Sequence, residues 1–91
     1  MNDVDDYSLK GKQKDIDFIV NNYNVHGEFA VCAYVWDEYG DEHQCIFKVY
    51  KSEESGEIFL KSRWDTELYT VDEFTYYYDF YYKVFDIEDR F

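Results

Sequence analysis

The stretch TVDEFTYYYDFYYKVF, from Thr70 to Phe85, decides the fold, because it can cover a sheet as a helix or join that sheet as a strand. Thr70 and Glu73 have the spacing of a capping box, in which each side chain accepts a hydrogen bond from the other residue's backbone N–H. Asp72 and Glu73 also favour the positive end of a helix dipole. We therefore expect a helix over 70–88, with a buried stripe formed by Phe74, Tyr77, Tyr78, Tyr81 and Phe85.

The same stretch is rich in aromatic and β-branched side chains, which favour strands. A fourth strand is therefore the alternative to this helix. If the helix forms, Tyr76, Phe80 and Tyr82 lie at the margins of the stripe or outside it. There they either pack under an N-terminal helix or serve an interface, where tyrosine often supplies much of the binding energy.

Three segments upstream of this stretch predict an antiparallel sheet. Residues 28–36 (EFAVCAYVW), 43–51 (HQCIFKVYK) and 57–64 (EIFLKSRW) are rich in β-branched and aromatic residues. The polar loops between them, which contain Gly40 and Gly56, predict two hairpins.

The hairpin turns set the expected register. With a turn at Tyr39-Gly40, Cys32 lies opposite Phe47, and with a second loop over 52–55, Phe47 lies opposite Leu60. Side chains alternate between the two faces of a strand, so this register collects one buried face. That face consists of Cys32, Tyr34, Trp36, Cys45, Phe47, Val49, Ile58, Leu60 and Trp64.

The N-terminal part predicts a short helix. Ile16, Ile19, Val20 and Tyr23 recur at helical spacing, which indicates an amphipathic helix over 12–22, with an exit turn that ends at Gly27. Residues 1–11 are expected to form a frayed arm. The expected fold is therefore a single α+β domain over 1–91, with a short N-terminal helix, a three-stranded antiparallel sheet and a C-terminal aromatic helix.

The charge of the chain restricts its partners. Its 91 residues include 21 acidic and nine basic side chains, which give a net charge of -12. Nucleic acids and anionic membranes attract the opposite sign, so we expect neither as a direct partner. No stretch approaches the roughly 18 apolar residues of a membrane span, and the acidic N-terminus is unlike a secretory signal. The expected location is the cytoplasm of a host cell.

The residue pattern predicts a protein without enzymatic activity. Cys32, Cys45, His26 and His43 lack the close pairs typical of zinc sites, so both cysteines are interpreted as small buried hydrophobes. No catalytic triad and no glycine-rich phosphate loop can be recognised. We therefore expect no metal and no cofactor.

The carboxylates are the candidate binding residues. Some crowd the first hairpin loop and others surround the start of the predicted C-terminal helix. An acidic ridge can imitate duplex DNA, which carries a charge about every 1.7 Å along its axis. The alternative is a solvated surface that keeps a small domain soluble. The candidate partner-binding residues are Asp37, Glu38, Asp41, Glu42, Asp65, Glu67, Tyr69, Asp72, Glu73, Tyr76 and Asp79.

A resemblance to a known family is carried by Trp64, Glu67, Tyr69, Asp72, Glu73, Phe74 and Tyr76. This segment is similar to one in small acidic phage anti-CRISPR proteins that inhibit type II-A Cas9. There, a tryptophan precedes an acidic, tyrosine-bearing segment and a Glu-Phe pair that opens a helix. The resemblance implies a DNA mimic that occupies the Cas9 groove for the protospacer-adjacent motif, with Glu67, Asp72 and Glu73 as contacts.

Together these features predict a phage-type inhibitor that blocks the nucleic-acid site of a basic protein, possible targets being Cas9 or another host defence nuclease. An immunity protein that neutralises a basic nuclease toxin needs nearly the same surface. A third hypothesis is an assembly protein that dimerises through exposed aromatic side chains, so the chain is expected to be a monomer or a homodimer.

Overall fold

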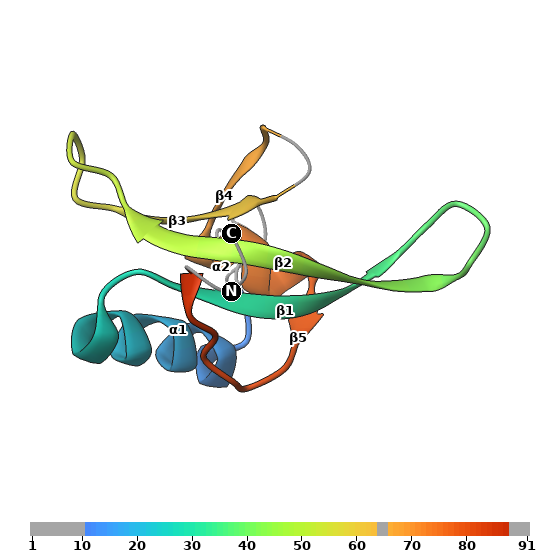
Figure 1. Cartoon of the computed structure of the whole chain (residues 1–91), viewed down its shortest axis with the longest axis horizontal. Coiled ribbons are helices and arrows are strands. Elements are labelled where there is room, and N and C mark those ends of the chain that lie inside the picture. Colours follow the sequence, from blue (N-terminus) through green and yellow to red (C-terminus); the bar gives the residue numbers. More distant parts are fainter. Residues whose placement is uncertain (1–10, 64–65, 88–91) are drawn as a thin grey trace, which may run out of the picture.

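A computed structural model describes residues 11–63 and 66–87 and shows an α+β architecture with two helices and one five-stranded antiparallel sheet (Figure 1). The strand order is β4-β3-β2-β1-β5. In chain order the elements are α1 (Gln13–His26), β1 (Phe29–Trp36), β2 (Glu42–Lys51), β3 (Ile58–Ser62), β4 (Leu68–Thr70), α2 (Val71–Tyr77) and β5 (Asp79–Phe80).

The N-terminal helix is confirmed and is longer than predicted. It continues through residues 23–26, because asparagine lowers helix propensity only modestly and cannot stop a helix alone. Gly27 ends it with a φ of 79°, and its N–H donates to the Tyr23 carbonyl at 2.8 Å. Ile19 is fully buried on the face that meets the sheet.

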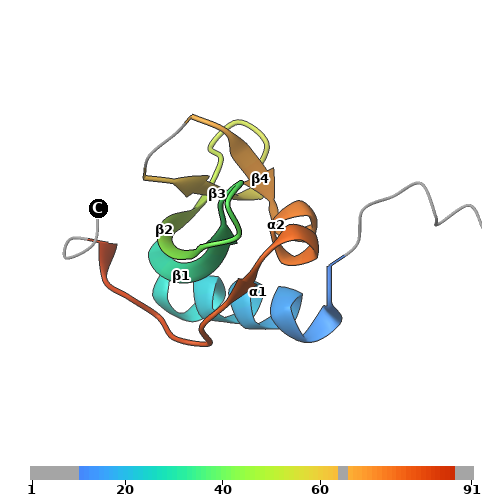
Figure 2. The same ribbon diagram turned by 90° about the vertical axis from the view of Figure 1, so that its right-hand side faces the viewer.

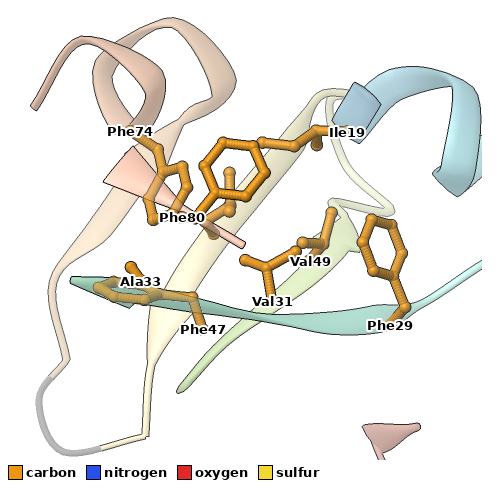
Figure 3. Close-up of a cluster of buried hydrophobic side chains, with 9 residues drawn as sticks. Ile19, Phe29, Val31, Ala33, Phe47, Val49, Phe74 and Phe80 are labelled. Carbon is orange, nitrogen blue, oxygen red and sulfur yellow. The ribbon is translucent and has the colours of Figure 1, made fainter. Parts of the chain in front are cut away.

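The core lies between the sheet and both helices. Figure 2 shows α1 and α2 together on one side of the curved sheet. Figure 3 shows the buried side chains that converge there from strands and helices. The cluster consists of Ile19, Phe29, Val31, Ala33, Phe47, Val49, Leu60, Phe74 and Phe80.

The predicted register of β1 against β2 is wrong by one residue. Cys32 pairs with Ile46, not Phe47, and Tyr34 pairs with Gln44. The connecting loop has five residues, 37–41, and an odd loop length puts the opposite face of β1 toward the core.

The shift in register changes the buried face of β1 alone. Phe29, Val31 and Ala33 face the helices, whereas the predicted core residues Cys32, Tyr34 and Trp36 lie on the other face of the sheet.

The second hairpin differs from the prediction by two residues, which preserves the faces. Lys51 pairs with Ile58, so the loop covers 52–57 instead of 52–55. Val49 therefore pairs with Leu60, and both remain in the core as expected. The predicted strand over 57–64 is shorter, and Trp64 lies outside the described residues.

The C-terminal helix begins where predicted and ends much earlier. Thr70 Oγ1 accepts from Glu73 N at 3.1 Å and Glu73 Oε1 accepts from Thr70 N at 3.0 Å, so the capping box is present. The helix stops at Tyr77 instead of residue 88.

The chain beyond this helix joins the sheet. Residues 79–80 pair with β1, and Phe85 forms a bridge with Ala30. The edge of β1 offers unpaired backbone groups, and a tyrosine-rich segment with high strand propensity satisfies them. The strand alternative is therefore correct for this part.

Because the helix is short, only part of the predicted aromatic stripe is buried. Phe74 is buried as expected, but Tyr77 and Tyr81 are exposed. Phe80, expected at the margin, is buried in the core. β4, which the sequence analysis does not predict, pairs with β3 immediately before α2.

The start of the described chain is held against α2. Gly11 lies so close to Thr75 that a Cβ at this position would overlap the threonine side chain. The remainder of the arm predicted over 1–11 lies outside the described residues. Within the described ranges, no helix is long and apolar enough to cross a membrane.

Candidate functional site

The first hairpin loop is organised by one carboxylate. Asp37 Oδ1 accepts hydrogen bonds from the backbone N–H groups of Tyr39 and Asp41, both at 2.9 Å. Its Oδ2 lies 2.7 Å from His43 Nε2. These bonds, first the one with His43, hold the pKa of Asp37 below its ordinary value because they favour the charged carboxylate. Asp37 therefore shapes the loop that carries the other acids.

The remaining acids of this hairpin face solvent. Glu38, Asp41 and Glu42 are exposed, and Tyr39 is 82% exposed at the tip. Figure 1 shows that the hairpin projects well beyond the helices. We call residues 36–43 the acidic hairpin. It presents its charges on a hydrogen-bonded arm rather than on a loose tail.

The predicted residues of α2 have different roles from one another. The carboxylate of Glu73 is half-buried and engaged by the Thr70 N–H, so it serves the helix start. Asp72 is exposed in the first turn. Tyr76 is 54% exposed and its ring meets Tyr77 edge-on at 5.2 Å between centroids.

Three other predicted residues lie apart from these groups. Tyr69 is half-buried, and its ring contacts Phe47 and Tyr78 at the rim of the core. Asp79 forms an ion pair with Lys12 at 2.7 Å near the start of α1. Asp65 lies outside the described residues. The predicted set is therefore not one continuous surface.

An aromatic hollow connects the hairpin to the region around α2. It has a volume of about 470 Å³ and opens to solvent. Tyr77 is 57% exposed, so its ring is accessible, and Trp36, which is 64% exposed, borders the hollow from β1 with its side chain on the opposite face. We call this site the aromatic hollow; it is lined by Tyr34, Val35, Trp36, Glu67, Tyr69, Tyr77 and Tyr78.

The residues of this hollow could not be grouped from the sequence, although the charge distribution contains a signal for it. Every lining residue comes from 29–47 or 64–82, and neither stretch contains a lysine or an arginine. The two stretches together hold nine carboxylates, four in the first and five in the second. The fold thus joins the two most one-sided parts of the chain around one concave surface.

Hydrogen bonds of the Tyr69 hydroxyl link three residues that line the aromatic hollow. Tyr69 Oη lies 3.0 Å from Tyr78 Oη and 3.4 Å from Glu67 Oε1. On the opposite face of the sheet, Tyr34 packs against Tyr81 with ring centroids 4.7 Å apart. The hydrogen bond with Tyr81, followed by desolvation, raises the pKa of Tyr34 to about 12. Its hydroxyl is therefore neutral at physiological pH.

The cysteines and histidines do not gather into a ligand set. Cys32 is buried on the sheet face opposite the helices, and Cys45 is half-buried. Within residues 11–63 and 66–87, no three His, Cys, Asp or Glu side chains are placed to hold one metal ion.

Comparison with family models, curated proteins and solved structures finds no match for this chain.

Proposed function

We propose that the protein binds a basic nucleic-acid-handling protein inside a host cell and blocks its nucleic-acid site by imitating phosphate charges. The acidic hairpin is the observation that carries this proposal. Glu38, Asp41 and Glu42 are exposed on an arm whose shape is maintained by Asp37, and the surrounding residues 29–47 contain no lysine or arginine.

Ordered charges suit this role better than a loose acidic tail. The Debye length is about 10 Å at 0.1 M salt, so neighbouring carboxylates on one small tip reinforce each other's field. A groove that binds phosphates presents lysine and arginine side chains, and these form short charge-assisted hydrogen bonds with carboxylates as well. The hairpin therefore offers the complement of such a groove.

Exposed aromatic side chains support a protein as the partner. Trp36, Tyr39 and Tyr76 are all more than half exposed, and tryptophan and tyrosine are the residues that most often dominate protein interfaces. A partner surface with both cations and apolar contacts would use the hairpin and its neighbours together.

The segment from Trp64 to Tyr76 makes type II-A Cas9 the first target to test, because it resembles the Cas9-inhibiting anti-CRISPR proteins. Of the contacts implied by that resemblance, Glu67 and Asp72 are exposed. Glu73 is engaged in the capping box, so we propose Glu67 and Asp72 ahead of it. A basic nuclease toxin would require the same surface, and the identity of the bound partner separates the two functions.

Charge reversal with a matched control tests this proposal. The double variant Glu38→Lys/Glu42→Lys changes the net charge as much as Glu53→Lys/Glu54→Lys does in the other hairpin loop. Figure 1 shows the two loops at opposite ends of the sheet. The measurement is the association rate with the Cas9–guide RNA complex over a series of salt concentrations.

We expect the first double variant to lower the association rate about 10-fold or more at low salt, because it removes the steering field at the contact. The second should change the rate far less. Equal effects of the two variants would show that only net charge matters and would contradict a specific acidic site. A stable homodimer that persists in high salt would instead favour the assembly-protein hypothesis.

A further inference from the structure

The aromatic hollow has the composition of a receptor for a cation. Tyr69, Tyr77 and Tyr78 line it from β4 and from the end of α2, and Glu67 supplies a carboxylate, whereas Tyr34 and Trp36 border it from β1 with their side chains on the opposite face of the sheet. An aromatic ring carries negative charge on its face and attracts a cation placed within about 6 Å of its centroid. The rings of Tyr69, Tyr77 and Tyr78 and the carboxylate of Glu67 therefore all favour a cation in this hollow.

We propose that the aromatic hollow receives the guanidinium group of an arginine side chain presented by the partner protein. This inference rests on the proposed function for the origin of the arginine, and on the hollow itself for the choice of a cation.

The charge around the hollow favours a cation over a neutral ligand. The stretches that line it, 29–47 and 64–82, contribute carboxylates and no lysine or arginine. Glu42 pairs with Trp36 across the first two strands and adds an acid at this end of the sheet, on the face that carries Trp36. An incoming cation would thus meet no lysine or arginine from the lining segments.

The geometry and hydration of the two cationic groups favour arginine over lysine. A guanidinium is planar and weakly hydrated, stacks on aromatic rings, and presents a fork of N–H donors that matches a carboxylate. Tyr77 offers an accessible ring, and Glu67 offers the acceptor. Tyr69 Oη lies 3.4 Å from Glu67 Oε1 and thereby helps to orient this carboxylate. An ammonium group could use the charge but not the stacking.

The test uses the intact chain and small probes of defined charge. Nα-acetyl-arginine amide is titrated into the ¹⁵N-labelled protein, and the Trp36 indole N–H signal, assigned with a Trp36→Phe variant, is followed by NMR. The matched probes are the lysine amide, the neutral citrulline amide and tetramethylammonium. We expect saturable shifts with arginine at a Kd on the order of millimolar, weaker binding of lysine, and no saturation with citrulline.

Two pairs of variants locate the site. Glu67→Gln removes the charge of the hollow, and Glu38→Gln removes one from the hairpin tip. Tyr77→Leu removes a ring of the hollow, and Tyr39→Leu removes an exposed ring elsewhere. We expect the two hollow variants to weaken arginine binding at least about fivefold and the two hairpin variants to leave it unchanged, with all four retaining the wild-type backbone spectrum.

Three results would overturn the inference. These are the absence of saturable shifts with arginine, equal weakening by Glu67→Gln and Glu38→Gln, and tighter binding of tetramethylammonium than of arginine. None of them depends on a partner protein, so such a failure leaves the hairpin experiment on the proposed function unaffected. Loss of arginine-dependent shifts with an intact hairpin effect would therefore reject only the hollow.

Discussion

Asp37 Oδ2 lies 2.7 Å from His43 Nε2 across the base of the first hairpin loop, while Oδ1 of the same carboxylate holds the backbone of that loop. The loop closed in this way has five residues, 37–41. Its odd length determines which face of β1 meets the helices. One carboxylate thus connects the arrangement of the core with the presentation of the acidic surface.

The first prediction concerns the protonation of Asp37. Its pKa is lowered in the folded state, so its contribution to loop stability is fully present above its ordinary value of 3.8 and is lost as the pH falls through the lower folded value. Amide exchange of Tyr39 and Asp41 should therefore remain protected down to about pH 4. Protection should be lost in more acidic solution.

Substitutions at the same position provide the controls. Asp37→Asn keeps an acceptor for the two N–H groups and should remove the acid-dependent loss, whereas Asp37→Ala should abolish protection at every pH. Glu38→Gln, in the same loop, should leave the profile unchanged. Wild-type protection that is already lost well above pH 4, or an unaffected Asp37→Ala variant, would contradict the role assigned to this carboxylate.

The second prediction concerns the helix start. Thr70→Ala removes the acceptor for the Glu73 N–H, 3.1 Å away, and should lower the free energy of unfolding by about 1 kcal/mol. The measurement is chemical denaturation followed by circular dichroism. Thr66→Ala, at an exposed position before β4, is the matched control and should be close to neutral. Equal effects of the two substitutions would argue against a working capping box.

Features governed by neighbours in the chain could be predicted from the sequence. The capping box of Thr70 and Glu73 depends only on local spacing, and Gly27 interrupts the chain as expected because glycine adopts positive φ, although α1 continues to His26 instead of ending at residue 22. The three central strands follow from their β-branched and aromatic content. Phe47, Val49 and Leu60, the buried side chains of β2 and β3, are among those that the sequence predicts.

Features governed by distant contacts could not be predicted. The end of α2 at Tyr77 depends on pairing of Phe80 with Ala33, far away in the chain. The register of β1 depends on the side-chain bonds of Asp37, which a pattern of hydrophobic residues does not reveal. The aromatic hollow unites Trp36 with Tyr77, and no local spacing relates these two residues.

The third prediction concerns the close approach of Gly11 to α2. A Cβ at this position would overlap the side chain of Thr75, which is fully buried and donates to the Val71 carbonyl at 2.7 Å. Gly11→Ala should therefore destabilise the fold by about 1–3 kcal/mol, as overpacking of a closed site does. Asn21→Ala, at an exposed position of α1, should change stability by less than about 0.5 kcal/mol. A Gly11→Ala variant as stable as the wild type would contradict this contact.

The fourth prediction separates the two thiols. Cys32 is 6% exposed under the segment that follows β5, whereas Cys45 is half-buried. Thiol labelling of the single variants Cys32→Ser and Cys45→Ser should thus show faster modification of Cys45. Tyr81 lines the same recess as Cys32, and its N–H donates to the Cys32 carbonyl at 3.0 Å. Tyr81→Ala should accelerate labelling of Cys32 without altering Cys45, and faster native labelling of Cys32 than of Cys45 would contradict the structure.

Competition for a single site tests the proposed mimicry most directly. A fluorescent duplex carrying the protospacer-adjacent motif is bound to the Cas9–guide RNA complex, and this protein is added at increasing concentration. We predict complete displacement of the duplex, a displacement curve that shifts in proportion to duplex concentration, and loss of displacement in the Glu38→Lys/Glu42→Lys variant but not in Glu53→Lys/Glu54→Lys. Formation of a ternary complex in which protein and duplex remain bound together would contradict occupation of the nucleic-acid site.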